Sequence, residues 1–154
     1  MSRLRKFLEL TPTTQGLLTR ALVLVALIRI ALWVLPFRML GPLLTRCTSN
    51  PTGGRHADGA LVDRTAWAVA VVARYVPRAT CLTQALAAQV LLAREGEASK
   101  LHIGVARDQR GGVRAHAWLE HRGRIVIGGA SANDFVPLSL LPERGSRAKE
   151  WATG

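Results

Sequence analysis

The hydrophobic periodicity of the chain changes near residue 100, and this change constrains the fold more than any other feature of the sequence. Before it, apolar residues recur at helical spacing over 12–35, 60–76 and 81–94. After it, apolar and polar residues alternate in short segments, at 101–105 and 113–120, with a further strand at 124–127. We therefore predict an α+β fold, in which N-terminal helices precede a small antiparallel β-sheet.

The apolar positions of the second helical segment also predict which side faces the core. Pro77 ends this helix, and Gly96 ends the next one. A further short helix is predicted at 38–46, before a polar, glycine-containing loop at 48–59. The predicted core-facing stripe of the helix at 60–76 consists of Leu61, Ala66, Trp67, Val69, Ala70, Val72 and Ala73.

Length and composition favour one compact unit. The chain has 154 residues, of which 49% are hydrophobic and 20% charged, enough for one core and too apolar for wholesale disorder. Within that unit we expect an N-terminal helical region and loop at 1–59. Residues 60–154 then form the domain that carries the candidate chemistry.

The charge of the chain is strongly positive. Lys and Arg number 21 against 10 Asp and Glu, a formal net charge of +11. Such a charge favours nucleic acid, anionic lipid headgroups or an acidic partner protein. The basic residues are scattered, however, and no aromatic-rich strand accompanies them, so we expect a diffuse positive surface and no nucleic-acid partner.

The most hydrophobic segment is 21–35, which could be a signal peptide, a membrane span or a buried helix. Pro36-Phe37-Arg38 follows it in place of a small-residue cleavage site, which argues against a signal peptide. Arg29 lies near its middle, which argues against a span. We expect a helix on or beside the domain, and the flanking Arg20 and Arg38 leave peripheral membrane contact open.

The two cysteines, Cys47 and Cys81, lie in different contexts and do not suggest a disulfide scaffold. No CxxC pair or paired Cys/His spacing indicates a structural zinc site. We expect no cofactor and no metal, and a cytoplasmic location with membrane association left open.

Cys81 lies at the predicted start of a helix, directly after Pro77-Arg78-Ala79-Thr80. A helix N-terminus carries partial positive charge and free backbone N–H groups, and both favour a thiolate over a thiol. The same N–H groups can stabilise the oxyanion of an acyl-transfer intermediate. Cys81 is therefore the candidate nucleophile.

His116 lies in the middle of a predicted strand, on the face shared with Trp118. An imidazole near a thiol can accept its proton and later return it to a leaving amine, so His116 is the candidate base. A lone cysteine or histidine is also often a structural residue. We give that interpretation to Cys47, and we expect three further histidines to face solvent: His56, His102 and His121.

Two stretches carry a resemblance to a known family: PRATCLTQALAAQVLLAREG and KLHIGVARDQRGGVRAHAWLEHRGRIVIGG. Cys-Leu at a helix start, a Leu-x-Ile-Gly-Val strand and Ala-His-Ala-Trp-Leu-Glu resemble the stand-alone leader peptidases of lasso-peptide biosynthesis, over 67–129. The apolar N-terminal helix with its PFRML ending also looks like theirs. The resemblance implies a transglutaminase-like, papain-related cysteine-protease fold, with Cys81 as nucleophile and His116 as general base.

The resemblance also implies a third residue, an aspartate that orients the histidine near the end of 124–129. This sequence has Ile127, Gly128 and Gly129 there, so no carboxylate is available. A backbone carbonyl, a water or Asp134 could take its place. Asp134 is also readily explained as a turn residue.

The function implied is removal of the leader from a ribosomally made lasso-peptide precursor. The partners implied are the precursor peptide, a separate leader-recognition protein and an ATP-dependent lasso cyclase. Two alternatives remain open: a non-catalytic scaffold of the maturation complex, and a basic membrane-associated binding module that rests on 11–38 and the net charge.

Overall fold

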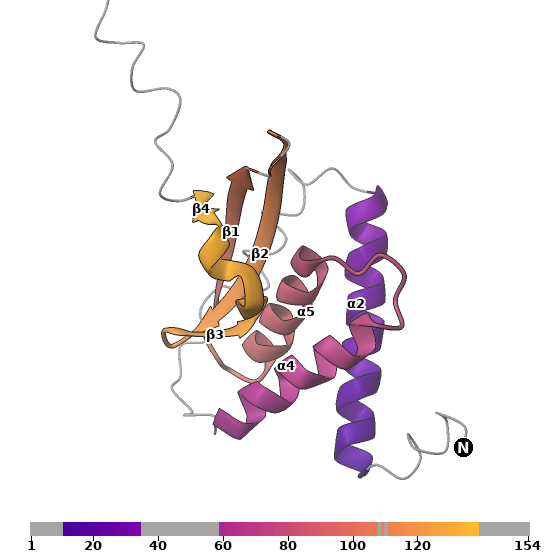
Figure 1. Ribbon diagram of the computed structural model, residues 1–154. Coiled ribbons are helices and arrows are strands. Elements are labelled where there is room, and N and C mark those ends of the chain that lie inside the picture. The colour runs from indigo at the N-terminus through magenta and orange to yellow at the C-terminus, as the bar shows by residue number, and fades with distance from the viewer. Residues whose placement is uncertain (1–10, 35–58, 108, 110, 139–154) are drawn as a thin grey trace, which may run out of the picture.

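The computed structural model describes residues 11–34, 59–107, 109 and 111–138 (Figure 1). The helix predicted at 38–46 lies outside these residues. Within them, helices precede an antiparallel sheet, which confirms the predicted α+β fold. The elements are α2 (Pro12–Val34), α4 (Gly59–Ala73), α5 (Cys81–Arg94), β1 (Lys100–Arg107), β2 (Val113–His121), β3 (Arg124–Ile127), the 3-10 helix η1 (Gly129–Asp134) and β4 (Val136–Pro137).

Helix α5 is the centre of the core. Thr80 caps its N-terminus, because the Thr80 hydroxyl accepts a hydrogen bond from the Thr83 N–H at 3.4 Å. The residues from Ala85 to Leu92 are all buried, and many are alanines that let neighbouring elements approach closely. Gly96 follows with φ of 83°, a left-handed conformation that glycine adopts without strain and that ends the helix as predicted.

Helices α2 and α4 pack against each other and against α5 (Figure 1). The face of α2 that is turned inward consists of Leu18, Ala21, Val25 and Ile28, which alternate at spacings of three and four. The corresponding row of α4 is Val62, Thr65, Ala68, Val69 and Val72.

The core-facing stripe predicted for α4 was wrong at two positions. Trp67 is 47% exposed and Ala70 is exposed, whereas Val62 and Thr65 are buried. Nearly every position of this helix is apolar, so the pattern left its rotation about its own axis undetermined. Packing against α2 and α5 determines which side of α4 is buried.

The sheet has the strand order β3-β2-β1-β4, and all its pairs are antiparallel. One face, with Ile103, Ala117 and Leu119, joins the main core around α5. The other face is covered by a second cluster of Trp118, Ala132 and Phe135. Strand β2 is therefore covered on both faces, and consecutive residues in its second half are buried.

Candidate active site

Cys81 is the first residue of α5, as the sequence predicts. Its thiol is free and partly buried at the edge of the main core. The Thr83 N–H is bonded to the Thr80 hydroxyl and the Gln84 N–H to the Thr80 carbonyl. In the described part of the chain, the N–H groups of Cys81 and Leu82 remain available to a substrate oxygen.

His116 lies on β2, where its ring makes one hydrogen bond to the described part of the chain. Its Nε2 lies 2.8 Å from the carbonyl oxygen of Gly128, between β3 and η1. A carbonyl oxygen can only accept, so Nε2 carries the proton and donates it. Within the residues that the structure describes, Nδ1 has no hydrogen-bond partner. In the neutral ring Nδ1 therefore has a free lone pair, which is what a general base requires.

Aromatic rings hold the His116 ring from two sides. Trp118 is 5% exposed and stacks on it at 6.1 Å between ring centroids, so the predicted shared face is confirmed. Phe135 lies on another side at 5.1 Å. Sequence reasoning missed Phe135, which follows a short polar segment and carries no strand or helix pattern of its own.

Gly104 leaves the space that the side chains of Trp118 and Phe135 occupy. The sequence analysis assigned this glycine no role. A Cβ added there would lie 2.8 Å from Cζ3 of Trp118 and 2.9 Å from Cβ of Phe135. Only glycine fits beneath the indole ring. A lone glycine inside a strand pattern is a signal of such close approach and could have located it.

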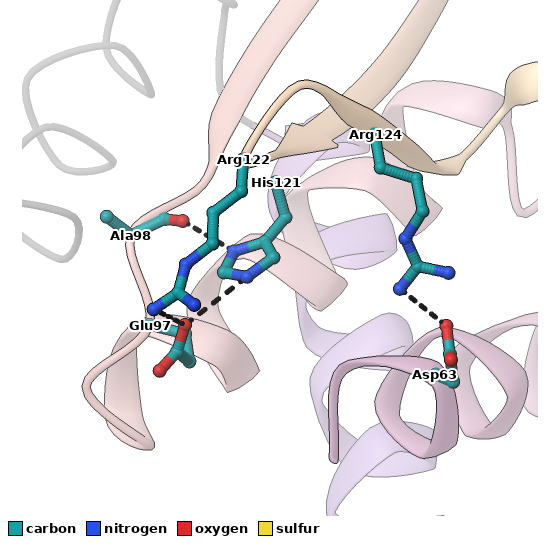
Figure 2. A network of polar contacts seen from close by, with 6 residues as sticks. All are labelled: Asp63, Glu97, Ala98, His121, Arg122 and Arg124. Atoms are coloured by element: carbon teal, nitrogen blue, oxygen red, sulfur yellow. Dashed lines mark hydrogen bonds and ion pairs between the residues drawn. The ribbon is translucent and has the colours of Figure 1, made fainter. Parts of the chain in front are cut away.

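Two further histidines, His102 and His121, are not solvent-facing as the sequence predicted. His121 is only 7% exposed: its Nδ1 lies 2.8 Å from the Ala98 carbonyl and its Nε2 3.3 Å from the Glu97 carboxylate (Figure 2). The expectation that His121 faces solvent was wrong, because β2 ends against the loop between α5 and β1. His102 is also largely covered, stacked on Trp118 at 5.5 Å. His56, like Cys47, lies outside the described residues.

The fold brings the elements of Cys81 and His116 together but does not join the two side chains. Helix α5 packs on β2. The His116 ring, however, lies with Trp118 and Phe135, while Ala117 and Leu119 face the helix. Among the described residues, no hydrogen bond connects the thiol to the ring.

A family model described as the transglutaminase-like superfamily matches residues 21–140. The chain belongs to the transglutaminase-like superfamily. No curated protein and no solved structure matches it significantly. The superfamily includes cysteine peptidases and transglutaminases, which form or break acyl bonds through a cysteine.

Gly128 lies near the position where the family resemblance implies an aspartate. The structure explains why a glycine is needed there. Gly128 has φ of 78°, and a Cβ added to it would lie 2.7 Å from the Ala117 carbonyl oxygen and 3.2 Å from Nε2 of His116. A side chain does not fit, and the backbone carbonyl bonds the ring instead. Asp134, the other candidate, is exposed on η1. In the described part of the chain, no group of three or more His, Cys, Asp or Glu is arranged to hold a metal ion.

Proposed function

We propose that this member of the superfamily is a cysteine peptidase in which Cys81 is the nucleophile and His116 the general base. The observation that carries the proposal is the bond from His116 Nε2 to the Gly128 carbonyl, 2.8 Å long. It fixes the tautomer that leaves Nδ1 as a proton acceptor, which is one of the two tasks of an orienting aspartate. A neutral carbonyl performs the other task, stabilisation of the imidazolium, less well than a carboxylate.

The reaction then has two halves. His116 Nδ1 accepts the thiol proton of Cys81 while the sulfur attacks the scissile carbonyl carbon, and the N–H groups of Cys81 and Leu82 bind the oxyanion. Collapse breaks the C–N bond, and Nδ1 returns its proton to the leaving amine. Water, deprotonated by Nδ1, attacks the thioester and releases the carboxylate product and the free thiol.

The proposed substrate is the leader–core junction of a lasso-peptide precursor. The resemblance of residues 67–129 to stand-alone leader peptidases supports it. The proposed partners are a separate leader-recognition protein, which presents the precursor, and an ATP-dependent cyclase, which closes the ring. The net charge of +11 suits an acidic leader or partner.

The experiment follows leader release by mass spectrometry, with purified chain, precursor and recognition protein. The proposal expects cleavage by the wild type, none by Cys81→Ala, and cleavage close to wild type by Cys47→Ala, which removes the other thiol. Equal rates for wild type and Cys81→Ala would overturn it.

A non-catalytic scaffold of the same complex is the second candidate. The absence of a hydrogen bond between the thiol and the ring, among the described residues, favours it. Alkylation separates the two candidates. A thiolate paired with His116 reacts with iodoacetamide faster in wild type than in His116→Ala, whereas in a scaffold the two rates are equal.

A further inference from the structure

Within the described residues, one face of α2 is apolar and exposed. It consists of large side chains that are each between 42% and 79% exposed: Leu22, Val23, Leu27, Ile30, Trp33 and Val34. Leu27 and Val34 are seven residues apart, as are Val23 and Ile30, so each pair lies on the same side of the helix. The strip from Leu22 to Val34 is about 18 Å long at the α-helical rise. Soluble proteins rarely leave an apolar strip of this size without an occupant.

Three arginines, Arg20, Arg64 and Arg94, form a basic corner beside the strip. Arg20 lies seven residues before Leu27, on the same side of α2. With Arg64 of α4 it lines a cleft of about 730 Å³, and with Arg94 it lines a smaller hollow beside it. Among the residues that the structure describes, Glu95 is the one acidic residue lining both. In the described part of the chain none of the three guanidinium groups has an ion pair or hydrogen bond, so their charge is available to an external anion.

We propose that this face of α2 and its basic corner bind an anionic phospholipid surface, with α2 lying in the plane of the interface. The apolar strip enters the boundary between headgroups and acyl chains, and Arg20, Arg64 and Arg94 contact phosphate. Trp33, at the end of the strip, is the residue type that prefers this depth. The net charge of +11 draws the whole chain to the same surface.

The packing of α2 distinguishes lying on a membrane from crossing it. By length and mean hydropathy, 2.2 over its most apolar window, α2 could cross a bilayer. Its other face, however, is only 0–8% exposed and forms part of the core with α4 and α5: Leu18, Ala21, Val25 and Ile28. A crossing helix would have to leave that core and carry Arg29 into hydrocarbon. An in-plane helix keeps both faces covered.

The test is co-sedimentation of the full chain with vesicles of phosphatidylcholine alone or of phosphatidylcholine mixed with phosphatidylglycerol. We expect binding to the mixed vesicles that weakens with added salt. Leu27→Glu/Ile30→Glu should bind at least about tenfold more weakly. The matched control is Val113→Glu/Val136→Glu, which changes the net charge equally at exposed valines of the sheet and should bind several times more strongly than the α2 variant. Arg20→Gln/Arg64→Gln should bind the mixed vesicles about tenfold more weakly than the wild type. This loss of binding should exceed that of the control Arg74→Gln/Arg107→Gln.

Several results would overturn the proposal. One is wild-type binding equal to that of Leu27→Glu/Ile30→Glu, or no binding to either vesicle. A dimer that this variant converts to a monomer would assign the face to a second copy of the chain. If circular dichroism showed that this variant is unfolded, the apolar face of α2 would be assigned to packing against another segment of the same chain. Retention on vesicles after an alkaline wash would indicate a crossing helix.

Discussion

Two histidines of one strand show how the surroundings decide the role of a side chain. His116 is partly buried, and one of its ring nitrogens is bonded to a carbonyl while the other has no hydrogen bond within the described residues. His121, five residues later, is buried, and both its ring nitrogens face acceptors, the Ala98 carbonyl and the Glu97 carboxylate. Both nitrogens of His121 are therefore occupied by neighbouring groups of the fold. The His116 ring keeps one nitrogen open to a reacting group, whereas the His121 ring fastens the end of β2 to the loop before β1.

The largest expected effect is the difference in leader-cleavage rate between variants of His116 and His121. His116→Ala should lower the rate of leader cleavage by about 10⁴, the scale of losses at catalytic triads. His121→Ala removes no group from the chemistry and should retain cleavage at a temperature where the variant is folded. Cleavage rates measured by mass spectrometry under single-turnover conditions check both. Comparable losses in the two variants, both shown to be folded, would contradict the comparison.

The second effect concerns stability. Glu97 is 2% exposed, and Glu97→Ala leaves the buried His121 ring without its carboxylate, which should cost about 3 kcal/mol of unfolding free energy. The control is Glu120→Ala, whose more exposed carboxylate lies 3.1 Å from His102 without hydrogen-bond geometry. It should cost under about 1 kcal/mol. Urea unfolding of both variants measures the difference, and equal costs would show that burial of the pair does not matter.

The third prediction tests what holds His116. Gly128→Ala places a Cβ 2.7 Å from the Ala117 carbonyl oxygen and requires a left-handed backbone. It should displace the Gly128 carbonyl and lower kcat by about tenfold or more. It should also lower the free energy of unfolding by about 1–2 kcal/mol. Gly129→Ala, where the nearest atom is 3.5 Å away on Ile125, is the neighbouring control and should change kcat little. If Gly129→Ala lowered kcat as much as Gly128→Ala, the carbonyl would not be the orienting group.

The smallest effect concerns an exposed counterpart of the Glu97–His121 pair. Arg124 and Asp63 form an ion pair of 2.7 Å between β3 and α4 (Figure 2), but both side chains are more than half exposed. Asp63→Asn should change the unfolding free energy by no more than about 0.5 kcal/mol, and that change should diminish in high salt. Urea unfolding at two salt concentrations checks this. A loss as large as that of Glu97→Ala would mean that exposure does not weaken the pair.

Local features of the site could be predicted from the sequence. Cys81 opens a helix because Thr80 and Thr83 provide the cap, and both lie within four residues of it. His116 shares a face with Trp118 because they are two residues apart in a strand. The role of the Gly128 carbonyl was open among several candidates, because the ring and the carbonyl are 12 residues apart in the chain.

The sequence by itself determined the α+β class, the bounds of α5 and the place of Cys81 at its start, since short-range periodicity and capping decide these. Only the tertiary structure decided which side of α4 is buried, that His121 is covered, and that a backbone carbonyl bonds His116. Those outcomes depend on contacts between segments far apart in the chain. The spacing of apolar residues along one helix or strand carries no information about which distant group will lie beside it.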